Sequence, residues 1–285
     1  MAEKVFFNDG LVDVGEVCIA ASDSGFLYGM GLFETMRSYK GFVFRLGDHV
    51  ERLFSSAAAL SINNTYDKKF VIEAVYQTLK ANKLSEGRLR LTLTSGPMAA
   101  FEEQQRPTLL ITATKAQPYP SEYYKKGVLV VLCPFRQNTT EPVCGHKTTN
   151  YLSRMIALEE ARGQRAAEAV WFTVDNRLAE GCISNIFLVK DSRLYTPPVN
   201  TPVLAGIARK TVCELAVDNS IGLVEKDLTI DDLLGADEVF LTNVIMKVLP
   251  ISRIEKHRVG EGKVGSMTKR LLKLFDSYIE QHCRG

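Results

Sequence analysis

One stretch of the chain, Gly145-His146-Lys147-Thr148-Thr149-Asn150-Tyr151, separates irregular sequence from helical sequence. Pro142 argues against a helix upstream, whereas apolar residues recur at helical spacing downstream, from Leu152 to Leu158. The pattern therefore predicts that Lys147 lies on a turn just before a buried amphipathic helix. The positive end of a helix dipole and partial burial both favour the neutral amine, which is the form that attacks carbonyl carbons. A lysine in such a context is more often simply solvated, so a second signal is needed.

The second signal is a longer motif downstream, which reads Arg177-Leu-Ala-Glu180-Gly-Cys-Ile-Ser184-Asn185-Ile-Phe-Leu-Val189. Its glycine favours a tight turn between two strands, with Glu180 at the turn. Together, Lys147-Thr-Thr-Asn-Tyr151 and Glu180-Gly-x-x-Ser184-Asn185 resemble the pyridoxal-phosphate enzymes of fold type IV. That family contains the branched-chain and D-amino acid aminotransferases and 4-amino-4-deoxychorismate lyase.

The resemblance runs along nearly the whole chain and implies an α/β fold of two domains and a homodimer. A segment punctuated by Pro118 and Pro120 is the best candidate for a linker. We therefore expect a small N-terminal α/β domain (residues 1–117), a linker (118–126) and a larger C-terminal domain (127–285). By resemblance, the larger domain binds pyridoxal 5'-phosphate and contains a barrel-like sheet.

Composition excludes several other classes of protein. The 285 residues are 46% hydrophobic, and the net charge of +2 is spread evenly, which argues against nucleic acid and anionic membranes as partners. The N-terminus carries charges where a signal peptide would be apolar, and no apolar run is long enough to span a bilayer. Six cysteines without a CxxC spacing fit reduced thiols in the cytoplasm, and four scattered histidines predict no metal site.

The segment Gly29-Met-Gly31-Leu-Phe33-Glu34-Thr35 invites comparison with a dinucleotide-binding loop. That comparison fails because Glu34 stands where the third glycine should be and a strand pattern follows. The segment is instead similar to the family's Gly-x-Gly-Phe-Glu stretch. By resemblance, Phe33 is a wall of the substrate pocket and Thr35 a nearby hydroxyl; a loop packed against its own domain is the alternative.

Two arginines acquire a role only through the resemblance. Arg52 lies off the apolar face of a predicted helix, but His49-Val-Glu-Arg52-Leu53 matches the family's His-x-x-Arg-Leu, whose arginine contacts the cofactor phosphate. Arg90 would face solvent from an alternating strand, Arg88–Thr94, although the branched-chain enzymes imply contact with the substrate carboxylate. After Gly96 the arginine-rich loop of the D-amino acid aminotransferases and the lyase is missing.

Two further segments predict a phosphate site. Gly206 precedes a helix start at Ile207-Ala208, where free amides could bind an anion, although an ordinary glycine-led helix is the alternative. The strand-turn-strand pattern around Thr242-Asn243 resembles the family's second phosphate contact. By resemblance, Lys147 carries the cofactor and moves the substrate's α-proton, and other residues hold the cofactor: Glu180 at its pyridine nitrogen, Tyr151 at its ring hydroxyl, Leu204 beneath its ring, and Ser184 and Asn185 in the shared motif.

The expected reaction is transfer of an amino group between a small amino acid, branched-chain or D-type, and a 2-oxo acid. The alternative is 4-amino-4-deoxychorismate lyase, which releases pyruvate and 4-aminobenzoate. Thr35 and the spelling Thr242-Asn243-x-x-Met246 favour the lyase, whereas the strand Arg88-Leu-Arg90 and the missing arginine loop favour transamination. A binding protein without chemistry would be expected to lack the lysine, and a nicotinamide oxidoreductase would need the phosphate loop excluded above.

Overall fold

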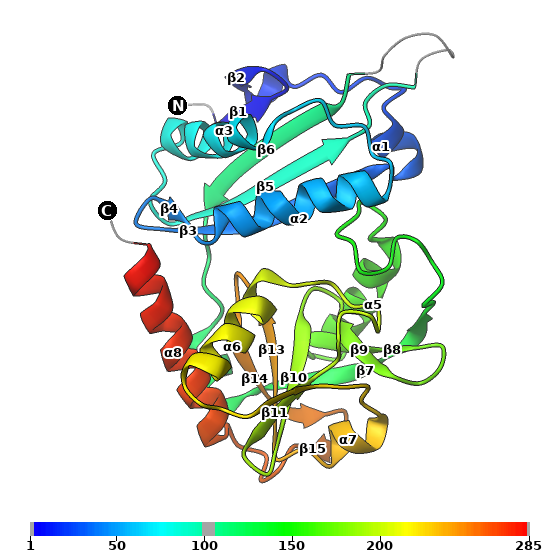
Figure 1. Ribbon diagram of the computed structural model, residues 1–285, viewed down its shortest axis with the longest axis vertical. Helices are drawn as coiled ribbons and strands as arrows, with labels where there is room; N and C mark the ends of the chain where they lie inside the picture. The colour runs from blue at the N-terminus through cyan, green and yellow to red at the C-terminus, as the bar shows by residue number, and fades with distance from the viewer. Residues whose placement is uncertain (1–2, 99–105, 284–285) are drawn as a thin grey trace. The chain divides into compact units, whose positions relative to one another are not determined.

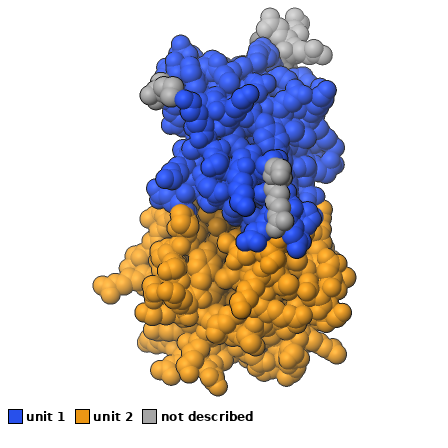
Figure 2. Space-filling view, turned by 90° about the vertical axis from the view of Figure 1, so that its left-hand side faces the viewer, with its two compact units in different colours: residues 1–117, 146–150, 279–285 blue, residues 118–145, 151–278 orange. Residues whose placement is uncertain are grey.

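The computed structural model describes residues 3–98 and 106–283, which divide into two units (Figure 2). Unit 1 contains Met1–Gln117, His146–Asn150 and Ile279–Gly285, and unit 2 contains Pro118–Gly145 and Tyr151–Tyr278. Segments 146–150 and 279–285 therefore group with the N-terminal part, whereas the sequence assigns them to the C-terminal domain. Residues 99–105 lie outside the described residues. They include most of the segment after Gly96 in which the sequence lacks the family's arginine-rich loop.

Unit 1 is built on an antiparallel sheet with the strand order β2-β1-β6-β5-β3-β4. Its strands are β1 (Lys4–Phe7), β2 (Gly10–Asp13), β3 (Gly31–Tyr39), β4 (Phe42–Val43), β5 (Gly87–Thr94) and β6 (Thr108–Lys115). The sequence predicts a longer strand over residues 41–46. The observed strand, β4, is shorter because Arg45 has a left-handed backbone (φ 50°) and helix α2 begins at the next residue.

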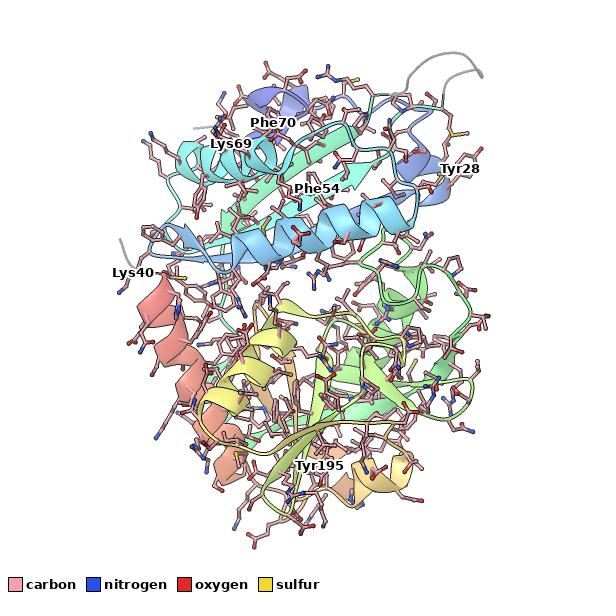
Figure 3. The ribbon with its side chains drawn as sticks, viewed as in Figure 1. Tyr28, Lys40, Phe54, Lys69, Phe70 and Tyr195 are labelled. Atoms are coloured by element: carbon pink, nitrogen blue, oxygen red, sulfur yellow. The ribbon has the colours of Figure 1, made fainter. Side chains whose placement is uncertain are left out.

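Helices α2 (Leu46–Ala59) and α3 (Lys68–Ala81) cover one face of this sheet (Figure 1). The alternating strand β5 directs Leu89, Leu91 and Leu93 into that core, while Phe54 and Phe70 pack at its border on the two helices (Figure 3). A short 3-10 helix (Val14–Glu16) and helix α1 (Ser24–Tyr28) complete this part of the chain. The opposite face of the sheet carries the alternate residues of β3 and β5.

Segment 146–150 joins unit 1 through backbone pairing with β3. The amide of Phe33 donates to the Lys147 carbonyl (2.9 Å), and the amide of Thr149 donates to the Gly31 carbonyl (2.8 Å). Leu32 and Thr148 thus form an isolated antiparallel bridge. Lys147 is consequently held beside the first residues of β3, next to this bridge, rather than on a turn.

Unit 2 contains a nine-stranded mixed sheet, in which β12-β11-β10-β13-β14-β7-β8-β9 are neighbours in this order and β15 pairs with β14. The strands are β7 (Val128–Gln137), β8 (Glu168–Thr173), β9 (Leu178–Gly181), β10 (Asn185–Lys190), β11 (Arg193–Thr196), β12 (Leu223–Glu225), β13 (Glu238–Asn243), β14 (Lys247–Ile254) and β15 (His257–Arg258). The helices are α4 (Ser121–Lys126), α5 (Leu152–Gly163), α6 (Ile207–Asp218), α7 (Ile230–Leu234) and α8 (Ser266–His282), of which α8 groups with unit 1 from Ile279 onward.

The centre of unit 2 is apolar on both faces of its sheet. Phe187 and Phe240, on β10 and β13, are fully buried and stacked, with their ring centroids 5.0 Å apart. Because buried strands have apolar neighbours on both sides, they read as continuous hydrophobic runs rather than alternating ones. In the part of the chain that the structure describes, no helix has both the length and the apolar character to cross a membrane.

Candidate active site

Lys147 is positioned by the sheet of unit 1. Its Nζ lies 4.3 Å from the centroid of the Phe33 ring, on the strand with which its backbone pairs. Helix α5 begins only at Leu152, so Lys147 is outside the first turn, where a helix dipole acts. The dipole effect expected from the sequence therefore does not apply. An aromatic ring and a strand backbone hold this amine instead.

Arg90 contacts the same aromatic ring. Its Cζ lies 3.4 Å from the Phe33 centroid, and it pairs across the β3–β5 ladder with Thr35. Residues two apart on β3 share a face, so Phe33, Thr35 and Arg90 lie together on the face away from α2 and α3. The structure thus brings the three predicted substrate residues together with Lys147. An amine and a guanidinium on one ring suit a ligand with a carboxylate.

On the other face of β3, Glu34 is the centre of a buried ion-pair network. Its Oε1 accepts from Arg52 Nε (2.8 Å), and its Oε2 accepts from Arg52 Nη2 (2.5 Å) and lies 2.7 Å from His49 Nδ1. Burial opposes ionisation of Glu34, but Arg52 and His49 outweigh it and lower the pKa of this carboxyl to about 2. Burial lowers the pKa of His49, and although Glu34 opposes this, Arg52 and Lys147 add to it. The Glu34 pair therefore fixes the Arg52 guanidinium in one orientation.

In unit 2, Glu180 lies at the end of strand β9 and is buried, and both of its carboxylate oxygens have partners. Oε2 accepts from the Leu204 amide (3.0 Å), and Oε1 accepts from Arg154 Nη2 (2.6 Å). Asn185 Nδ2 donates to the Leu204 carbonyl (2.8 Å) and lies 3.4 Å from Glu180 Oε2. The structure thus brings together Glu180, Asn185 and Leu204, three of the predicted cofactor residues.

The start of α6 has the features of a phosphate site. Gly206 is its N-cap, and no side chain caps the first turn, which begins at Ile207 and Ala208. A Cβ at Gly206 would lie 1.9 Å from Asn185 Oδ1, so only glycine fits this close approach. Across the β10–β13 ladder from Asn185, the buried Oγ1 of Thr242 has no hydrogen-bond partner among the described residues. An uncapped helix start beside an unsatisfied hydroxyl fits the phosphate of a cofactor.

Tyr151 and Asn243 contact the turn that follows Glu180. The Tyr151 hydroxyl donates to the Cys182 carbonyl (3.1 Å), and burial raises the pKa of this tyrosine to about 12. Asn243 Nδ2 donates to the Ile183 carbonyl (3.0 Å), while its Oδ1 accepts the amides of residues 245 and 246. Asn243 therefore stabilises two turns at once, its own and the one after Glu180.

Two charged residues of unit 2, one buried and one partly buried, are absent from the sequence interpretation. Glu168 accepts from the Cys182 amide (3.0 Å), the Ile183 amide (3.4 Å) and the Ser184 hydroxyl (3.0 Å). Burial raises the pKa of Glu168 to about 7, although these hydrogen bonds oppose it. The other residue is Arg154, which pairs with Glu180. Neither gives a sequence signal, since charged residues on helices and at strand ends are usually solvated.

Comparison with known proteins agrees with this geometry. A profile of the family described as amino-transferase class IV matches residues 31–254. D-alanine aminotransferase of Staphylococcus epidermidis is 32% identical, and the match covers 98% of this chain and 99% of that protein. The branched-chain aminotransferase of Thermoproteus uzoniensis, solved with norvaline, superposes with a TM-score of 0.90 and 29% identity over 98% of this chain and 95% of its own. A Legionella pneumophila structure named for 4-amino-4-deoxychorismate lyase gives a TM-score of 0.83 and 26% identity over 92% and 95% of the two chains.

The family match covers most of the chain and includes both paired motifs. Its extent, together with the two-unit α/β architecture, confirms the predicted fold class of a fold-type IV enzyme. The chain therefore belongs to the class IV aminotransferases, enzymes that work with pyridoxal 5'-phosphate.

Proposed function

We propose that this aminotransferase moves an amino group between a small amino acid, of the D-alanine or branched-chain class, and a 2-oxo acid. The observation that carries the proposal is the contact of Lys147 and Arg90 with one ring, that of Phe33. An amino acid presents an amine-bearing carbon next to a carboxylate. Lys147 is suited to act at the amine-bearing carbon. Arg90 is suited to bind the carboxylate, because a guanidinium fork matches carboxylate geometry.

The residues of the chain bind the cofactor and move protons. When bound, pyridoxal phosphate delocalises the electrons released at the substrate's α-carbon. We assign covalent attachment and transfer of the α-proton to Lys147, whose amine can act as a nucleophile and a base. Glu180 is assigned to the pyridine nitrogen, where its negative charge favours the protonated ring. Tyr151 is assigned to the ring hydroxyl, and Leu204 to the underside of the ring.

The phosphate is assigned to three groups with donors of suitable chemistry. These are the amides at Ile207 and Ala208, the Thr242 hydroxyl and the Arg52 guanidinium. Support comes from the uncapped start of α6, from the unsatisfied Thr242 Oγ1 and from the fixed orientation of Arg52. We propose that Asn185, Ser184 and Asn243 contribute by holding the surrounding turns, a role consistent with their hydrogen bonds.

One feature that favoured the lyase has a structural explanation. Met246 is buried in the core of unit 2, and Asn243 accepts its amide to close the turn. The sequence pattern Thr242-Asn243-x-x-Met246 is therefore explained by packing and by the turn, and it does not distinguish the lyase from the aminotransferase. Transamination is the reaction that we propose, with the lyase as the outcome against which it is tested.

The test is a half-reaction. The holoenzyme is mixed with one amino acid at a time, L-valine, L-leucine or D-alanine, without a 2-oxo acid, and the visible absorption of the bound cofactor is followed. Transamination requires stoichiometric conversion to the pyridoxamine form by at least one of them. Lack of conversion, together with steady pyruvate release from 4-amino-4-deoxychorismate, would establish the lyase instead.

Two variants accompany this test. Lys147→Ala should lose both the conversion and the covalent trapping of cofactor by borohydride, because it removes the amine. Lys126→Ala, which alters an exposed lysine at the end of α4, should behave like the parent protein. Borohydride trapping that survives Lys147→Ala would place the cofactor on a different lysine.

We also propose a cytoplasmic homodimer. All six cysteines lie within the described residues and none forms a disulfide, as expected in a reducing compartment. Helix α1 exposes Phe26, Leu27 and Tyr28 to solvent, an apolar surface of the kind that partner subunits cover (Figure 3 labels Tyr28).

A further inference from the structure

Arg154 contacts the turn after Glu180 at several points. From the first turn of α5, its Nη2 donates to Glu180 Oε1 at 2.6 Å. Its Nη1 donates to the Gly181 carbonyl at 3.0 Å and lies 3.4 Å from the Cys182 carbonyl. One guanidinium therefore holds the Glu180 carboxylate and the backbone next to it.

The surroundings of Arg154 are mostly aromatic. Its Cζ lies 5.6 Å from the ring centroid of Tyr151 and 5.5 Å from that of Trp171. Its side chain is 19% exposed and that of Glu180 only 3%. An ion pair shielded from water in this way is stronger than a surface pair, and removing either partner leaves a buried charge without compensation.

The charge of Arg154 is permanent under all physiological conditions. Burial alone would lower its pKa, but Glu180 and Tyr151 raise the pKa above its usual range. The carboxylate of Glu180 therefore always faces a cation on Oε1 and the Leu204 amide on Oε2. These two donors, one on each oxygen, restrict the orientation of this carboxylate.

We propose that Arg154 is a positioning residue, which holds the Glu180 carboxylate in one orientation, beside a fixed positive charge, for the cofactor's pyridine nitrogen. The inference rests on the proposed role of Glu180 and extends it to the arginine that pairs with this carboxylate. Arg154 acts only through Glu180, so its effect must disappear when the Glu180 carboxylate is replaced by an amide.

The experiment is a double-mutant cycle with Arg154→Met, Glu180→Gln and the combined variant. Arg162→Met is the matched control, because Arg162 lies on the same helix but forms only an exposed pair with Glu159. Three quantities are measured: urea unfolding of the cofactor-free protein, the visible spectrum and affinity of added pyridoxal phosphate, and kcat and KM for the complete transamination with both substrates present.

We expect Arg154→Met to lower kcat by about tenfold to a hundredfold with little change in KM, the range for coupling within one hydrogen-bond network. In the Glu180→Gln background the same substitution should change neither kcat nor the spectrum. It should destabilise the cofactor-free protein in the parent background, where it leaves a buried carboxylate without its cationic partner, and much less in the Glu180→Gln background. Arg154→Lys should restore part of kcat, since it keeps the charge but cannot reach the carboxylate and the carbonyl together. If Arg154→Met does not fold, Arg154→Lys replaces it in the double-mutant cycle.

Two results would overturn the inference, and they are distinguishable. Equal losses from Arg154→Met in both backgrounds would show that Arg154 does not act through Glu180, while the role of Glu180 would stand. An unchanged spectrum and kcat in Glu180→Gln itself would remove Glu180 from the pyridine nitrogen, and with it the role inferred for Arg154, while the proposal of transamination would stand on its own half-reaction test.

Discussion

At the scale of the residue, two buried glutamates respond to pH in opposite directions. Glu168 has a pKa raised to about 7, so the folded protein retains a proton that the unfolded chain has already lost. Its contribution to stability is present below its ordinary pKa and is lost as pH rises toward 7. Glu34 has a pKa lowered to about 2, so its contribution is complete above its ordinary pKa and is lost only on acidification toward 2.

Glu168→Gln should therefore become progressively more stable than the parent protein as pH rises from 5 to 8. The glutamine is a neutral substitute for the protonated acid, and the gain should reach on the order of 2–3 kcal/mol. Urea unfolding at intervals across this range gives the comparison. Glu159→Gln, at an exposed position on α5, should show no such trend. A constant difference between Glu168→Gln and the parent would mean that Glu168 stays ionised throughout.

At the scale of the element, the start of α6 depends on the absence of a side chain at Gly206. Gly206→Ala should push away Asn185, which holds the Leu204 carbonyl beside Glu180. We expect a loss of about 1–3 kcal/mol in stability, as for other overpacked sites, and weaker binding of pyridoxal phosphate measured by titration. Gly163→Ala is the control, because a Cβ there meets nothing within 4 Å. Unaltered cofactor affinity in Gly206→Ala would separate this helix start from the phosphate.

Helix α5 shows what sequence periodicity could not determine. Its period was predicted correctly, but Leu152, Met155 and Ile156 are exposed, whereas the buried face consists of Ala157, Leu158 and Ala161. Two of these three buried residues are alanines, and Leu158 is the one large apolar side chain of the helix on its buried face, whereas the other three large apolar residues are exposed. Period indicates a helix, but the face that is buried depends on the shape of the sheet beneath it.

The same limit applies to the candidate site. The helix start after Gly206 could be predicted from turn chemistry, which is a local property. Strand alternation places Arg88 and Arg90 on one face, but only the resemblance to the family pointed to Phe33 and Arg90 as substrate residues. The pairing of Arg52 with Glu34, and of Arg154 with Glu180, joins residues on different elements. Only the fold creates such pairs, so a single sequence offered no signal for them.

At the scale of the whole molecule, the exposed surface of α1 makes a prediction about assembly. Phe26 is 77% exposed and Tyr28 60%, and the chain turns at Gly29, whose carbonyl accepts from the Thr149 hydroxyl and Asn150 Nδ2. This surface is therefore joined directly to the segment that contains Lys147. A second copy of the chain bound to the exposed surface of α1 would restrict the motion of residues 146–150 and would also remove apolar area from water.

Phe26→Ser combined with Tyr28→Ser should shift the protein from dimer to monomer in sedimentation equilibrium and lower turnover in parallel. Val217→Ser removes a single exposed apolar side chain from α6 and should leave the dimer intact. A parent protein that sediments as a monomer, or a double variant that remains dimeric, would exclude this surface as the subunit contact.

The path of the chain between the units limits how the protein can be recombined. Among the described residues, the chain passes from one unit to the other after Gln117, Gly145, Asn150 and Tyr278. A chimaera made by a single cut after Gln117 would therefore combine the Phe33 face from one parent with a lysine segment from the other. To exchange the face that contains Phe33 and Arg90 between relatives, residues 1–117 and 146–150 have to be transferred together, although they are separate in the sequence.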